Sequence, residues 1–161
     1  MTEPIDVLNA LRFDSETGTG LFENADLVTA AMLARRANCT DETVLLALGL
    51  SVWAHRNGHA CLNLDTLTED LGRAISRSGQ EWVLPTLPTA KQFDKALRAS
   101  PLVRVLAAPG TSAEALADTR PLVLIENRFS SQRQFADEVL VAESVRALIA
   151  HSDDVTSPAA V

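Results

Sequence analysis

The sequence has no tyrosine, few other aromatic residues and only two cysteines. Two thiols, Cys39 and Cys61, are too few for the disulfide scaffold of a small secreted protein. No apolar run approaches the ~20 residues that a transmembrane helix needs, and the N-terminus does not resemble a signal peptide. We therefore expect a cytoplasmic protein with reduced thiols and no membrane association.

Motifs for nucleotide chemistry are also missing from the sequence. It contains no GxxxxGK[ST] phosphate loop. The segment "GTGLF", which starts at Gly18, lacks the preceding strand and the remaining glycine of a dinucleotide-binding fingerprint. We expect the chain to bind no cofactor and to have no catalytic residues.

Charge is distributed unevenly along the chain. The formal net charge is −7, and the excess of acidic residues lies at the two ends, since acidic and basic residues are equal in number between positions 31 and 151. A nucleic-acid-binding domain normally carries a basic patch or stripe. The sequence therefore gives no electrostatic reason to expect autonomous binding to DNA or RNA.

Helical periodicity dominates what is present. With 161 residues, of which 47% are hydrophobic, the chain can bury a core without disulfides or a structural metal. Residues 24–38 carry apolar side chains at helical spacing, and a short amphipathic helix is expected over residues 4–12. Residues 43–57 are apolar on nearly every side and end at Asn57-Gly58, which predicts the central helix of the core.

Short strand patterns lie between further helices. Strands are expected near residues 61–64 and 101–106, and residues 121–129 read as a hairpin that turns at Glu126-Asn127. Thr66 and Glu69 have the spacing of a capping box before a helix, as do Ser131 and Gln134 before a long helix that ends near Ala150. A helix is also expected over residues 90–100, and a surface loop with at most one helical turn over 108–120.

These patterns predict a mainly α fold of the α+β class. We expect a helical bundle around a central apolar helix, with a small antiparallel β-sheet or hairpin. Residues 1–151 would form a single domain, and the polar, aperiodic residues 152–161 would be a linker or a disordered tail.

A group of His55, His59 and Cys61 is the first candidate for a chemical site. Its spacing does not match the usual paired zinc ligands, and Cys39 is the only other thiol available as a fourth ligand. A nucleophilic Cys61 would need a cleft and an activating base. We favour a structural interpretation, in which Cys61 packs as a small buried hydrophobe and His59 lies in an exposed loop, so no metal site is predicted.

Arginines form the second candidate. Arg120, Arg128, Arg133 and Arg146 could form a phosphate-binding face, but acidic neighbours at Glu126, Asp137, Glu138 and Glu143 favour solvated salt bridges. Trp53 and Trp82 are expected to fill the core, and of the two Trp82 is the better candidate for a contact surface.

The order of these elements resembles a known family. The run "GHACLNL", a helical middle with "ASPLVRV", and "RPLVLIENRFSSQRQFADE" before a long helix are similar to the N-terminal domain of RecD, the alpha subunit of exodeoxyribonuclease V (RecBCD helicase-nuclease). That family has a "G-x-V-C-x-x-L" strand and a "P-L-x-L-x-x-x-R-L-Y-L-x-R-x-W" hairpin. The matching positions here are Gly58, Cys61, Leu64, Pro121, Leu122, Leu124, Arg128 and Arg133, and the resemblance spans about residues 21–150.

The resemblance implies a protein-interaction domain of a DNA-repair helicase subunit, without catalytic activity of its own. Its implied partners are RecC-like and RecB-like subunits of the same complex, and contact with DNA would be indirect. The candidate docking surface is the hairpin with the following helix, residues 121–150, because the aromatic residues of the family cluster there, and its candidate interface residues are Phe129, Arg133 and Phe135. The alternative is that both phenylalanines cap the core of the domain itself. Two alternatives stay open: a small regulatory or nucleic-acid-binding helical protein that uses the arginine face, and a hydrolase built around Cys61.

Overall fold

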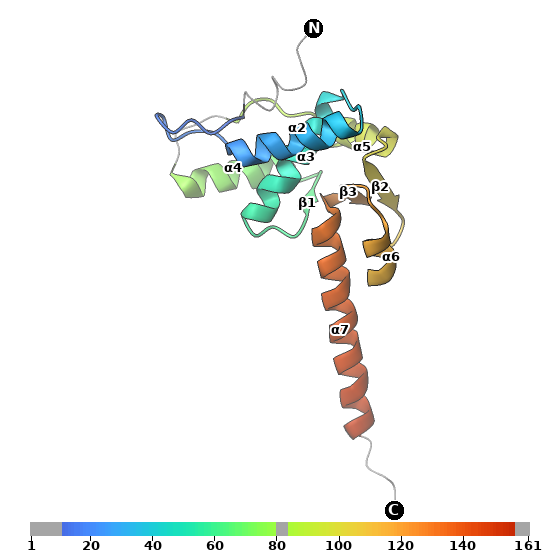
Figure 1. The fold of residues 1–161 in the computed structure, drawn as a ribbon. Helices are drawn as coiled ribbons and strands as arrows, with labels where there is room; N and C mark the ends of the chain where they lie inside the picture. The colour runs from blue at the N-terminus through green and yellow to red at the C-terminus, as the bar shows by residue number, and fades with distance from the viewer. Residues whose placement is uncertain (1–10, 80–83, 157–161) are drawn as a thin grey trace, which may run out of the picture.

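A computed structural model describes residues 11–79 and 84–156, which form six helices and four strands (Figure 1). The short helix expected over residues 4–12 lies mostly outside the described residues. In chain order the elements are α2 (Asn24–Arg36), α3 (Glu42–Arg56), β1 (Leu62–Asn63), α4 (Leu67–Ser78), α5 (Ala90–Ala99), β2 (Val103–Leu106), α6 (Ser112–Ala117), β3 (Leu122–Ile125), β4 (Arg128–Ser131) and α7 (Gln132–Thr156). The expected mainly α fold with a small sheet is confirmed.

Helix α3 is the central element of the core, as its apolar sequence predicted. It begins after Asp41, whose carboxylate accepts hydrogen bonds from the amides of Thr43 and Val44. It contacts α2, α5 and β4, so neighbours surround it on several sides. Every residue of α3 from Val44 to Ser51 is buried, and for this reason the helix needs no polar face.

The sheet is mixed, so the expectation of an antiparallel sheet was wrong in part. Its strand order is β1-β4-β3-β2; β4 pairs antiparallel with both β1 and β3, but β2 pairs parallel with β3. Parallel neighbours need a crossover connection. Here α6 supplies it within a segment expected to be a loop, and Thr111 caps α6 by accepting from the amide of Glu114.

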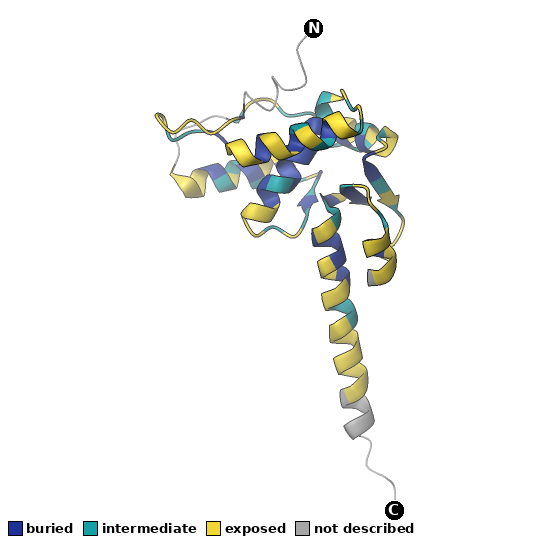
Figure 2. Cartoon of the chain, in the orientation of Figure 1, coloured by how far each residue is buried: buried dark blue, intermediate teal, exposed yellow. Residues whose placement is uncertain are grey.

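The two faces of the sheet support two separate cores, because successive side chains of a strand point to opposite faces. Leu122, Leu124 and Phe129 join α3 in the large core. Val123 belongs to a small second core, together with Ala115 of α6 and Phe135, Ala136 and Val139 of α7. In the part of α7 whose burial is described, Figure 2 shows buried residues on the first turns alone.

Helix α7 follows β4 directly and projects away from the body of the domain (Figure 1). Ser131 accepts a hydrogen bond from the amide of Gln134, and Gln134 Nε2 donates to the carbonyl of His59 at 2.6 Å. The second bond fixes the start of α7 to the loop that follows α3. The helix continues to Thr156, so residues 152–156 are helical where a linker or tail was expected, and residues 157–161 are not among the described ones.

Two local expectations also differ from the structure. Thr66 does not form the expected capping box, because its hydroxyl donates to Asp70 Oδ2 at 2.7 Å and no side-chain cap is made. Strand β1 has two residues, Leu62 and Asn63, where a strand of at least four was expected.

Candidate docking surface

The distal part of α7 carries large apolar side chains that the domain does not cover. Val141, Val145 and Leu148 have the i, i+4, i+7 spacing of one helix side, and Leu140 and Ile149 flank them. All five are between 49% and 70% exposed. We call these five residues the α7 stripe. Contiguous exposed apolar patches are uncommon on monomeric proteins, and they often mark sites of contact with another molecule.

A groove of about 360 Å³ lies beside the start of α7, on the sheet face that carries the small core. Its apolar lining comes from three elements: Val123 and Ile125 of β3, Phe135, Val139 and Ala142 of α7, and Pro109 and Gly110 of the loop after β2. Val123, Phe135 and Val139 are themselves buried, so they form the floor of the groove. This volume lies within the ~300–1,000 Å³ typical of ligand pockets.

Polar groups occur on the same groove. Arg128, Glu138 and Arg146 are exposed lining residues, and Cys61 and Ser130 complete the lining. Neither arginine forms an ion pair with another residue between positions 11–79 or 84–156. Burial, and then the carboxylate of Glu138, raises the pKa of the Cys61 thiol, although Arg128 lowers it. The thiol is therefore neutral at pH 7, and the groove carries two positive charges against one negative.

The three residues predicted as the interface do not come together. Phe129 is buried in the large core, where its ring stacks on Phe93 with centroids 6.4 Å apart. Phe135 lies on the other side of the sheet, where it belongs to the small core and lines the groove. Arg133 is exposed on α7. Of the three, Phe135 alone contributes to the groove.

His55, His59 and Cys61 have different surroundings in the structure, and His55 is exposed on α3. His59 is half-buried and stacks on Trp53 with ring centroids 5.4 Å apart, so it is not the exposed loop residue that was expected. Cys61 is half-buried in the groove instead of packing in the large core, because Leu62 points into that core and its neighbour points away. Among the described residues, no group of three or more His, Cys, Asp or Glu side chains could hold a metal ion.

The four arginines do not share one face. Arg120 pairs with Asp118, with Nη2 and Oδ2 2.5 Å apart, and this contact lowers the pKa of Asp118 to about 2. Arg133 and Arg146 are 13 positions apart on α7, which places them about 140° apart around the helix. Trp82, the other candidate contact residue, lies outside the described residues.

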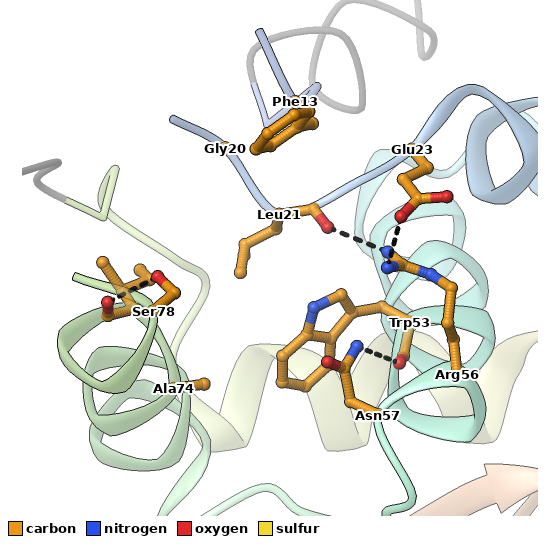
Figure 3. A pocket seen from close by; sticks show the side chains of 10 residues that line it. Phe13, Gly20, Leu21, Glu23, Trp53, Arg56, Asn57, Ala74 and Ser78 are labelled. Atoms are coloured by element: carbon orange, nitrogen blue, oxygen red, sulfur yellow. Dashed lines mark hydrogen bonds and ion pairs between the residues drawn. The ribbon is translucent and has the colours of Figure 1, made fainter. Parts of the chain in front are cut away.

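A second, smaller pocket of about 170 Å³ lies between the loop over residues 11–23, the end of α3, and α4 (Figure 3). Arg56 closes one side of it. Its guanidinium bonds Glu23 Oε1 at 2.7 Å, Asp26 Oδ2 at 2.8 Å and the carbonyl of Leu21 at 3.3 Å. These contacts hold the first described loop against α3, so we interpret this pocket as a structural junction.

The sequence prediction placed the docking surface on the hairpin and the following helix, but it named no residue of the α7 stripe and did not foresee the groove. The stripe had a signal, because Val141, Val145 and Leu148 repeat at helical spacing beyond the residues that the small core can reach. The groove had none, because it combines a strand, a loop and a helix that meet only in the folded chain.

None of the helices within the described ranges has the length and apolar character that a membrane crossing requires. A comparison with curated proteins gives no match. The family model described as "RecBCD enzyme subunit RecD, N-terminal domain" matches residues 18–129, which is more than half of the chain and runs from the first loop into β4. The chain therefore belongs to the family of RecD N-terminal domains, as its sequence resemblance indicated.

Proposed function

We propose that this domain is a docking module of a RecD-like subunit in a cytoplasmic DNA-repair helicase and exonuclease complex. It would hold the subunit to RecC-like and RecB-like partners, reach DNA only through the complex, and perform no chemistry itself. The family membership supports the setting, and the lack of a phosphate loop in the sequence supports the non-catalytic role.

The observation that carries the proposal is the α7 stripe. Its five large apolar side chains stand on a helix that leaves the body of the domain, and the described residues cover none of them fully. The hydrophobic effect favours removing such a surface from water by about 25 cal/mol per Å². A partner protein is well suited to bury the α7 stripe, since the centres of protein interfaces are apolar and depleted of charge.

The nucleic-acid alternative fits the arrangement of charges less well. Arg120 is neutralised by Asp118, and the remaining three arginines are divided between the groove and another side of α7. DNA-binding surfaces cluster Lys and Arg on one face to neutralise several phosphates at once. Each side of α7 that carries one of these arginines also carries a carboxylate: Asp137 follows Arg133 by four positions, and Glu138 lines the groove with Arg146.

Mixing the purified chain with a RecC-like subunit from the same organism tests the proposal. Size-exclusion chromatography with light scattering should show a complex of the two proteins at micromolar concentration. ATP hydrolysis and DNA degradation by the chain alone should stay at background. Failure to form the complex, or turnover by a preparation free of contaminating enzymes, would contradict the docking role.

A further inference from the structure

The groove and α7 together present one continuous seam. Phe135, Ala142 and Ile149 are spaced by seven residues, so they drift by only about 20° per step around the helix. Phe135 and Ala142 line the groove, and Ile149 is exposed beyond it. A partner element that enters the groove can therefore continue along α7 without changing direction.

The length of the seam favours a helical partner. The seam from Phe135 to Ile149 covers about four turns of α7, which corresponds to about 21 Å. A helix that lies along another helix makes contacts every three or four residues, and its apolar anchors recur at i, i+3 or i+4, and i+7. The groove at one end provides the deepest part of this surface, with Val123, Phe135 and Val139 at its floor.

Charge determines what kind of helix fits. Arg128 and Arg146 line the groove, and neither has an ion-pair partner among the residues that the structure describes. Carboxylates at the edges of the partner's apolar face would pair with these two guanidinium groups. The net charge of −7 opposes an acidic partner only weakly, because distant charges are screened beyond about 8–10 Å at physiological salt.

A second copy of this chain is a poorer occupant. Over residues 132–151, where its side chains are described, helix α7 carries Asp137, Glu138 and Glu143 against Arg133 and Arg146. Pairing two such helices would bring an excess of like charges together. Like charges across an interface are unfavourable and select against a partner.

We infer that the groove and the adjoining side of α7 bind an amphipathic helix of a partner protein, whose aliphatic face is flanked by carboxylates. The inference rests on the proposed docking function, and it specifies the surface and the chemistry of its partner. Aliphatic anchors would enter the groove against Val123 and Phe135. The carboxylates would reach Arg128 and Arg146 at the rim.

Two pairs of variants on α7 test this inference. Ala142→Arg places a bulky charge in the groove, and Ala147→Arg makes the same change on an exposed position about 140° away around the helix. Arg146→Glu reverses a groove charge, and Arg133→Glu reverses a charge on the other side of α7. Circular dichroism melting would first establish that all four variants fold as the parent does.

Affinity for the RecC-like subunit is then measured by isothermal titration calorimetry. We expect the two groove variants to bind at least about tenfold more weakly, and the two control variants to stay within about threefold of the parent. Equal binding by the groove variants and the parent would overturn the inference while leaving the docking function intact. The inference would also be overturned if the groove variants and the control variants lost the same amount of affinity. It would likewise be overturned if the chain alone formed a dimer and the groove substitutions dissociated that dimer. Absence of binding by the parent would overturn the docking function as well.

Discussion

Arg56 joins the first described loop to the end of the central helix. Its partner Asp26 has a side chain only 2% exposed, whereas the Arg56 side chain is 37% exposed. Asp26 also accepts a hydrogen bond from the amide of Glu23, so one carboxylate connects the start of α2 to α3. A buried carboxylate is tolerated at this position because both of its contacts are made.

Arg56→Ala should lower the free energy of unfolding by about 2–4 kcal/mol, because it leaves the buried Asp26 carboxylate without its cation. The matched control is Arg73→Ala, whose partners Glu69 and Asp70 are more exposed. That change should cost less than about 1 kcal/mol. Urea unfolding followed by circular dichroism measures both values. Similar losses in the two variants would show that the junction at Arg56 does not stabilise the fold.

Cys61 reports the electrostatics of the groove. Burial is the main reason that the pKa of its thiol is raised; the carboxylate of Glu138 raises this pKa further, and Arg128 lowers it. In a Cys39→Ser background, Glu138→Gln should therefore lower the pKa, increase the thiolate fraction at pH 8 and speed alkylation. Arg128→Gln should raise the pKa and slow alkylation. The rate of iodoacetamide labelling as a function of pH gives the midpoint for each variant, and midpoints that move in the same direction would refute this description.

Elements set by local pattern could be predicted from the sequence, and elements set by distant pairing could not. Helices α2, α3, α5 and α7 and the β3–β4 hairpin follow from periodicity and turn residues. The parallel pairing of β2 with β3 depends on a crossover that no local pattern reveals. Thr66 shows a finer limit, because its hydroxyl had two acidic residues within reach and bonded Asp70. The sequence also did not determine which face of the sheet Cys61 points to. Adjacent strand residues point to opposite faces, so a shift of one residue in the alternation moves a side chain from one face to the other.

In the loop over residues 11–23, Gly20 is harder to replace than Gly18. Gly20 has φ +120°, and a Cβ at this position would lie 2.3 Å from the carbonyl oxygen of Arg12. Gly20→Ala should therefore destabilise the fold by about 3 kcal/mol or more. Gly18 also has a positive φ, +68°, but a Cβ there would meet nothing within 4 Å. Gly18→Ala should cost only about 1 kcal/mol, and thermal unfolding of both variants would show whether the two losses differ.

At the scale of the whole molecule, the residues that stabilise the fold and the surface that is available to a partner lie in different places. The large core around α3 lies on one side of the sheet, and the groove lies on the other side, beside the small core that α6 and α7 form with Val123. Mutations on distal α7 should therefore leave folding almost unchanged. This separation is what a docking module requires, because the contact surface can remain exposed until the partner binds.

The most direct test of the docking account compares two double variants. Val141→Ser with Leu148→Ser removes two exposed side chains of the α7 stripe, and Val28→Ser with Met32→Ser removes two exposed apolar side chains of α2 as a control. Calorimetric titration with the RecC-like subunit should show at least about tenfold weaker binding for the α7 variant and a change within about twofold for the α2 variant. Melting temperatures of both variants should stay near that of the parent. An α7 variant that binds as tightly as the parent would contradict the claim that this helix docks the domain to its partner.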